Sequence, residues 1–353
     1  MKRKYLGAGI ALAATIAAIV FVIYRWRTSG FAWSEFAAAL RLVDWSWLVL
    51  SQALVLATYL GRALRWEVML RPLRKDSSLW GIFTSTVIGF TAVLLFGRAG
   101  EAVRPYLIAK KEDVSFSSQI AAWIIERMLD LLMILLIFGI ALTQVSHSAI
   151  RSGPKIRVIL EAGGYTAGFT GAASLALLIA LRQLRAARLL AWLSFLPERI
   201  LRRIRTVLAS FEEGMQSMRG ARSMLLLVAY SIAEWMVIAA AFACVFRAFP
   251  ATRNLGITDV VILLGFVAFG SALQIPGVGG GMQIATVLVL TEFFGINFAT
   301  ASGIALVLWI ISFVAIVPIG LILAFHEGLK WRNLKHLGST VSSDESPSEG
   351  ESV

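Results

Sequence analysis

Blocks of apolar residues, separated by polar or basic stretches, follow one another along the chain. Six blocks are close to the roughly 20 residues that cross a bilayer as a helix. They cover residues 6–23, 45–60, 117–143, 160–181, 225–246 and 298–325. An amphipathic stretch at 31–43 is expected to lie on the outer surface. The pattern predicts an all-α polytopic membrane helix bundle with about six full spans.

Two further apolar blocks are interrupted by glycine. Residues 79–96 end at a turn that begins with Gly97, and residues 260–294 are broken at the run Pro276–Gly281. Non-helical backbone at membrane depth is tolerated only where protein or water covers it. Each pair of short arms therefore predicts a re-entrant or broken helical hairpin.

The two interrupted blocks resemble each other. Gly89-Phe90 stands before the first break as Gly265-Phe266 stands before the second. By the count of basic loops, the first hairpin is expected to enter from the cytoplasm and the second from outside. The two units are therefore expected to form an inverted repeat, which many secondary transporters use to build a site at the membrane midplane.

Composition and charge agree with a membrane protein. The chain is 58% hydrophobic and 15% charged, with a mean hydropathy of +0.78. The net charge of +12 is assigned to loops that face the cytoplasm and anionic lipid, and not to nucleic acid. On this basis both termini are cytoplasmic. After the second block, the basic residues are interpreted as a cytoplasmic cluster: Arg62, Arg65, Arg71, Arg74 and Lys75.

Three ionisable residues, Glu126, Arg127 and Asp130, lie inside the block 117–143. A charged side chain at the centre of a spanning helix costs roughly 2.5–3.5 kcal/mol on insertion scales, so these groups should face the protein interior. Glu126 and Asp130 share a helix face. Either one of the two carboxyls keeps its proton in a relay, or both clamp an arginine from the first hairpin, such as Arg98, in a structural network.

Glu234 lies alone inside the block 225–246. It is expected to pair with Arg127 across the bundle or to titrate.

The first glycine turn carries Arg98, Glu101 and Arg104 and is expected to open a short helix at Gly100. Free backbone N–H groups and the positive end of a helix dipole favour an anion there, and the arginines add to this preference. Two interpretations stay open: a binding site for a lipid phosphate, and an Arg–Glu network that only fixes the hairpin.

The second break is flanked by Gln274 and Gln283 and offers amides and exposed backbone without a fixed charge. It would hold a head-group hydroxyl or phosphate, or let helices approach closely. The candidate substrate-binding residues are therefore Arg98, Gly100, Glu101, Arg104, Glu126, Arg127, Asp130, Glu234, Gln274, Pro276, Gly277, Gly280 and Gln283.

The sequence offers little for other chemistry. It has no Walker-type glycine–lysine run, and its three histidines are far apart. The single cysteine, Cys244, has no convincing general base. We expect no cofactor, no metal site and no catalytic residue, so the protein is not expected to be an enzyme. An intramembrane enzyme that uses Glu126 and Asp130 as acid and base is the least favoured alternative.

Together, the motifs Gly97-Arg98-x-Gly100-Glu101-x-x-Arg104 and Glu126-Arg127-x-x-Asp130, with the Pro-Gly break before the last span, resemble the lysylphosphatidylglycerol synthase transmembrane (flippase-like) family. The resemblance covers roughly residues 5–330. It implies a bacterial or archaeal plasma-membrane protein that moves lipids between leaflets. One departure is Gln283, which stands where the family usually has a glutamate.

The leading interpretation is a flippase- or scramblase-like transporter of a lipid with an anionic phosphate head group, such as a phospholipid or a polyprenyl phosphate. The alternative is a non-transporting membrane partner that presents lipid to a separate head-group-modifying enzyme. The expected domain covers residues 1–338, with a basic amphipathic cytoplasmic segment at 183–222, followed by a disordered acidic tail at 339–353. An oligomer is compatible with this arrangement.

Overall fold

A computed structural model describes residues 32–148, 220–271, 274–275 and 279–328, with the single positions 165, 169, 171, 172, 176, 205, 209 and 214. The side chains of 98–99, 141–148 and 272–279 lie outside this description. So do the expected first span, most of the expected span 160–181 and of the segment 183–222, and the acidic tail.

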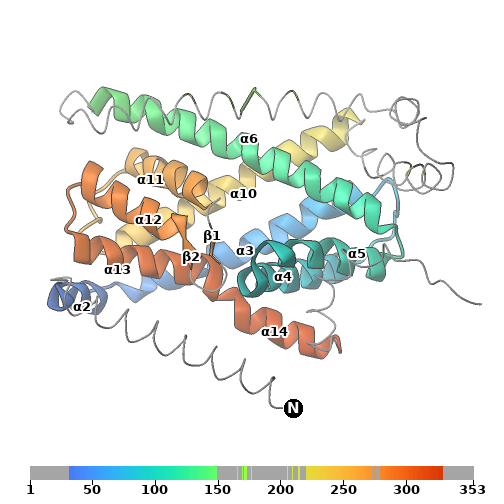
Figure 1. The fold of residues 1–353 in the computed structure, drawn as a ribbon, viewed down its shortest axis with the longest axis horizontal. Coiled ribbons are helices and arrows are strands. Elements are labelled where there is room, and N and C mark those ends of the chain that lie inside the picture. The colour runs from blue at the N-terminus through green and yellow to red at the C-terminus, as the bar shows by residue number, and fades with distance from the viewer. Residues whose placement is uncertain are drawn as a thin grey trace, which may run out of the picture.

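The described residues are almost entirely helical, as predicted (Figure 1). The elements are α2 (Trp33–Arg41), α3 (Trp45–Leu70), α4 (Leu79–Phe96), the 3₁₀-helix η1 (Gly97–Ala102), α5 (Val103–Glu112), α6 (Phe116–Ser148), α10 (Ala221–Ala248), α11 (Ile257–Gly270), the paired strands β1 (Gln274–Ile275) and β2 (Gly279–Gly280), α12 (Gly281–Leu288), the π-helix η4 (Val289–Phe293), α13 (Phe298–Trp309), the π-helix η5 (Ile310–Val314) and α14 (Ile316–His326). Four apolar helices in the described part are long enough to cross a membrane: α3, α4, α10 and the continuous stretch Phe298–His326. The chain is therefore a multi-pass membrane protein.

Helices α3 and α10 run alongside each other through the middle of the bundle (Figure 1). At one end, the backbone N–H of Asp44 donates to the carbonyl of Ala248 at 2.9 Å. Farther along, the Ser51 hydroxyl donates to the carbonyl of Ala241, also at 2.9 Å. Residue numbers rise along α3 as they fall along α10, so the two helices are antiparallel.

Helix α3 is longer than the sequence pattern predicted. The expected span ended at residue 60, but the helix continues to Leu70. Its last turns pack against protein, since Trp66 is fully buried and Met69 is almost so. The assignment of Arg65 to a cytoplasmic basic cluster is wrong, because its side chain has no exposed surface.

The first hairpin consists of α4, η1 and α5. The start of α4 and the end of α5 lie side by side. Gly97 ends α4 with a positive φ of 64°, which glycine adopts without strain. After the turn, α5 has 10 residues, or about 15 Å, which is too short to cross a bilayer. At its end, the Glu112 carboxylate accepts the backbone N–H of Ser78, the residue before α4, at 3.2 Å. The hairpin therefore returns to the end from which it starts.

The turn of this hairpin differs in one detail from the prediction. Residues 97–102 form a 3₁₀-helix, and the α-helix opens at Val103 and not at Gly100. Gly100 is required for close packing, because a Cβ at this position would overlap the backbone of Ala92 in α4.

The second hairpin consists of α11, the β1–β2 pair, α12 and η4. As predicted, the break lies between the two arms: α11 ends at Gly270 and α12 begins at Gly281. The arms approach closely, since a Cβ at Gly270 would lie 2.7 Å from the Gly281 carbonyl oxygen. This hairpin follows the end of α10 that lies beside the start of α3. The first hairpin follows the opposite end of the α3–α10 pair.

Each hairpin packs against the long helix that follows the other one. Helix α4 contacts α14, where a Cβ at Gly320 would overlap the Thr91 hydroxyl. Helix α11 contacts α6, where Phe138 stacks on Phe269 with ring centroids 5.3 Å apart. Helix α6 has 33 residues, or about 50 Å, and lies along one edge of the bundle (Figure 1).

Candidate functional site

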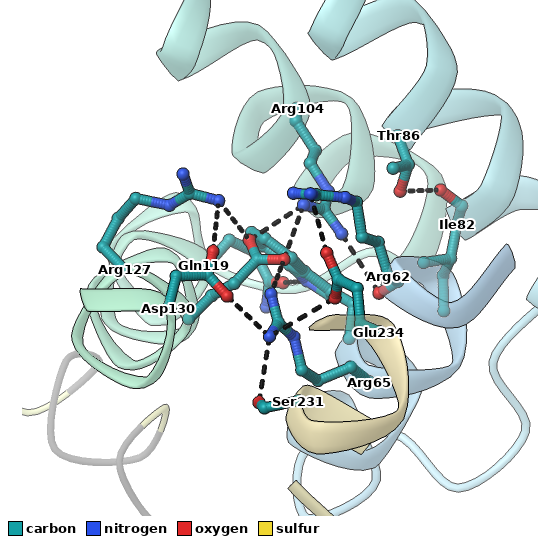
Figure 2. Close-up of polar contacts among 12 residues, drawn as sticks. Arg62, Arg65, Ile82, Thr86, Arg104, Gln119, Arg127, Asp130, Ser231 and Glu234 are labelled. Atoms are coloured by element: carbon teal, nitrogen blue, oxygen red, sulfur yellow. Dashed lines mark hydrogen bonds and ion pairs between the residues drawn. The ribbon is translucent and has the colours of Figure 1, made fainter. Parts of the chain in front are cut away.

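Four helices bring ionisable side chains together in the interior of the bundle (Figure 2). Carboxylates come from α6, with Glu126 and Asp130 on one face, and from α10, with Glu234. Guanidinium groups come from α3, α5 and α6: Arg62, Arg65, Arg104 and Arg127. The prediction that the charged residues of the spans face the interior is confirmed for Glu126 and Asp130, which are buried, whereas the Arg127 side chain is partly exposed. We refer to these seven residues as the charge cluster.

Arg65 lies at the centre of the charge cluster and has no exposed side-chain surface. Its Nη2 donates to Glu126 Oε1 at 2.7 Å, and its Nη1 donates to Asp130 Oδ1 at 2.8 Å. The same Nη1 lies 3.5 Å from Glu234 Oε2 and donates to the Ser231 hydroxyl at 3.0 Å. One side chain therefore ties α3 to both α6 and α10.

Arg104 links the first hairpin to the same carboxylate. Its Nη1 donates to both oxygens of Glu126, at 2.8 and 3.0 Å, and its Nη2 donates to the carbonyl of Arg62 at 3.2 Å. The guanidinium carbon lies 4.1 Å from the ring centroid of Trp66, within cation–π distance. Trp66 is held in turn by Gln119, whose Oε1 accepts the indole N–H at 2.9 Å. Charge, hydrogen bonds and stacking together fix α5 against α3 and α6.

Glu234 binds the arginines of α3. Arg62 Nη2 lies 2.7 Å from Glu234 Oε1, and the Arg62 guanidinium carbon lies 4.6 Å from the ring centroid of Phe90 in α4. The prediction that Glu234 pairs with Arg127 is wrong, because Arg62 and Arg65 point toward it from the adjacent helix.

Arg127 lies at the edge of the charge cluster (Figure 2). Its Nη2 is 3.1 Å from Asp130 Oδ2 and 3.5 Å from Glu126 Oε2. The side chain is 37% exposed, whereas that of Arg62 is 16% exposed and that of Arg104 is 5% exposed. Arg127 is therefore the most accessible cation of the charge cluster.

The other predicted site residues fall into two groups. At the first turn, Gly100 and Glu101 lie in η1 beside α5, while the Arg98 side chain is outside the described residues. Among the described side chains, the arginine of this hairpin that binds an α6 carboxylate is Arg104, which pairs with Glu126.

At the second break, Gln274 pairs with Gly280 in the two-residue strands, and Gln283 caps α12 by accepting the N–H of Gly280 at 2.7 Å. Pro276 and Gly277 lie outside the described residues. Strand β2 contacts α12, and α11 contacts α12 directly.

Sequence reasoning missed Arg62 and Arg65 as members of the site. A signal was present, because three carboxylates in apolar blocks require more cations than Arg127 can supply. Arg62 and Arg65 were assigned to a cytoplasmic loop, because the apolar pattern predicted that the second span ends at residue 60.

Chemically, the charge cluster is a network of ion pairs. Each of its three carboxylates is in an ion pair with at least two arginines. Within the described residues, no group of three or more His, Cys, Asp or Glu side chains could hold a metal ion.

Comparisons with known proteins agree with the motifs. A model of the family described as "Lysylphosphatidylglycerol synthase TM region" matches residues 7–320. Comparisons with curated proteins and with solved structures give no match. The matched range includes both hairpins and every residue of the charge cluster. The chain therefore belongs to the family of lysylphosphatidylglycerol synthase TM regions.

Proposed function

We propose that this protein moves a lipid with an anionic phosphate head group between the leaflets of a bacterial or archaeal plasma membrane, as a flippase or scramblase. One observation carries the proposal: two helical hairpins, each followed by a long helix, begin at opposite ends of the antiparallel α3–α10 pair. Hairpins with this relation are the elements from which many transporters build a site at the membrane midplane.

The packing of the helices supports an inverted repeat. In the proposed repeat, α3 to α6 correspond to α10 to α14. A two-fold axis through the antiparallel α3–α10 contact would then relate the contact of α4 with α14 to the contact of α11 with α6. The residues before the two long helices agree, since α6 begins at Phe116 and α13 at Phe298, after Val-Ser and Ile-Asn respectively.

The charge cluster gives this arrangement its selectivity. A phosphate moving across the apolar core needs a positive partner, because an isolated charge there is costly. Arg127 offers a partly exposed guanidinium, and the pairs behind it keep the neighbouring helices in place. In this mechanism the head group passes along the protein while the acyl chains stay in the bilayer. The protein binds and moves the lipid without changing its bonds, and movement is downhill or coupled to an ion gradient.

The test is reconstitution of the purified protein into liposomes that contain fluorescently labelled lipids of several classes. A membrane-impermeant quencher then reports how fast each lipid reaches the outer leaflet. We expect faster movement than in protein-free liposomes for at least one anionic phospholipid or polyprenyl phosphate. If no lipid class moves faster, the transport proposal fails, and a membrane partner that presents lipid to a separate enzyme becomes the better account.

A further inference from the structure

Glu234 is the one member of the charge cluster that comes from the second half of the proposed repeat. The other six lie on α3, α5 and α6, which belong to the first unit, α3 to α6. Glu234 lies on α10, the first helix of the second unit, α10 to α14. Its ion pairs with Arg62 and Arg65 of α3 therefore join the two units across the α3–α10 contact (Figure 2).

The three carboxylates of the charge cluster are not held equally. Glu126 accepts three hydrogen bonds from guanidinium groups, at 2.7, 2.8 and 3.0 Å, and Asp130 accepts one at 2.8 Å. Both oxygens of Glu234 are buried and accept no hydrogen bond from the described residues, although Arg62 Nη2 lies 2.7 Å from one of them. Hydrogen bonds to a carboxylate favour its charged form, whereas burial disfavours it. Glu234 is therefore the carboxylate whose charge is least stabilised by hydrogen bonds.

The other ionisable groups near Glu234 also come from α3 and α6. Tyr59 of α3 is buried and interacts with it electrostatically, and so do the carboxylates of Glu126 and Asp130. These two like charges disfavour a third negative charge beside them. Of the other helices that contact α10, α13 has no ionisable residue, and Asp259 of α11 caps the start of its own helix.

Neutralising Glu234 would leave the rest of the charge cluster in place. Arg65 keeps its hydrogen bonds to both carboxylates of α6 and to the Ser231 hydroxyl. Arg62 loses its carboxylate, but its side chain is 16% exposed, so water can solvate the guanidinium. What neutralisation removes is the charge attraction between the two units.

We propose that Glu234 is the proton-binding site through which lipid movement is coupled to a proton gradient. This inference rests on the proposed function and names its coupling ion. A proton that binds the carboxylate removes both ion pairs between the units and lets one unit rock against the other. Release of the proton restores the ion pairs and the arrangement described above. In transporters built from inverted repeats, alternating access is largely such a rocking of one repeat against the other.

The experiment follows labelled phosphatidylglycerol across liposomes that contain the full chain, with and without a pH gradient and with the membrane potential clamped by potassium and valinomycin. Under a gradient of about two pH units, which changes the proton activity about a hundredfold, the wild-type rate is expected to change by at least about threefold. Glu234→Gln has nearly the same shape as the protonated carboxyl. It should move lipid at the same rate with and without the gradient.

The matched control is Glu327→Gln. Glu327 follows α14 in the second unit and pairs with Lys111 of the first unit, so the same substitution removes another ion pair between the units. Its side chain is 24% exposed and lies outside the charge cluster. This variant should respond to the pH gradient as the wild type does.

A second measurement needs no variant. A pH-sensitive dye inside the same liposomes should report proton movement that accompanies wild-type lipid movement and is absent from empty liposomes. This readout decides the matter even if Glu234→Gln does not fold.

Four results would overturn the inference: wild-type lipid movement without proton movement, a Glu234→Gln variant that responds to the gradient like the wild type, a Glu327→Gln control that loses the response, and a wild type driven by a sodium gradient in place of the pH gradient. Failure of the proposed function looks different. A protein that moves no lipid class refutes transport itself, whereas one that moves lipid at a rate independent of the pH gradient refutes the proton site alone.

Discussion

Among single residues, Arg65 has the largest structural role, because it binds three carboxylates from two other helices. Arg65→Met would leave Glu126, Asp130 and Glu234 buried with fewer cations. Breaking a buried ion pair costs about 3–5 kcal/mol, so we expect a large drop in the melting temperature of the detergent-purified protein. The control Arg71→Met, at an exposed pair, should change stability by no more than about 0.5 kcal/mol. Equal melting temperatures for the two variants would contradict the central position of Arg65.

A second residue-scale prediction concerns geometry and not charge. Arg104→Lys keeps the positive charge but cannot lie flat on Trp66 while binding Glu126 and the carbonyl of Arg62. We expect a loss of about 1–3 kcal/mol, measured by thermal unfolding. Arg41→Lys, at the exposed end of α2, serves as the control. An Arg104→Lys variant as stable as this control would mean that charge alone holds the hairpin.

The sequence predicted five of the seven residues of the charge cluster and missed Arg62 and Arg65. Glu126, Asp130 and Glu234 were found because a carboxylate inside an apolar block stands out. Arg65 was not, since an arginine beyond an apolar block is typical of a cytoplasmic loop. What changed its environment is tertiary: other helices cover the last turns of α3, and no local pattern records that cover.

At the scale of the elements, the first hairpin depends on close backbone contact. Gly100→Ala places a Cβ against the backbone of Ala92, which cannot move without opening the hairpin. We expect a loss of about 1–3 kcal/mol in unfolding free energy and slower lipid movement. Gly139→Ala is the matched control, because a Cβ in this part of α6 meets nothing within 4 Å. A Gly100→Ala variant with the stability and rate of Gly139→Ala would contradict this role of the turn.

The positions of the elements were largely predictable, because the signals that end helices are local. Gly97 and the glycines before α12 interrupt apolar runs, and both breaks were confirmed. The backbone structure at each break, a 3₁₀-helix at the first and a pair of two-residue strands at the second, was not predictable. The 3₁₀ turn that delays α5 until Val103 follows from the contact of Gly100 with α4, which is a tertiary contact.

At the scale of the whole molecule, the two hairpins should open to opposite sides of the membrane. The protein has one cysteine, Cys244, which is largely buried, so single-cysteine variants can be labelled from either side. In a Cys244→Ala background we expect Lys75→Cys, before α4, to react from the cytoplasm. Arg253→Cys, before α11, should react from outside. Labelling of both variants from the same side by an impermeant maleimide would contradict the inverted arrangement.

The sequence suggested the repeat through short matches around Gly89 and Gly265 and through the direction of the spans. It could not predict that each hairpin packs on the long helix of the other unit, as α4 does on α14. That exchange is a property of the assembled bundle, since it joins segments that are far apart in the chain. Because of this exchange, helices from both units pack together in the interior of the bundle.

The most direct measurement for the central claim is the rate at which labelled phosphatidylglycerol crosses liposome membranes that contain purified protein. We expect the wild type and Gly139→Ala to accelerate crossing equally over protein-free liposomes. Arg127→Gln, reconstituted at the same density and with a normal melting temperature, should be slower by about tenfold. A wild-type rate no faster than that of empty liposomes, or an Arg127→Gln rate equal to that of the wild type, would contradict the account.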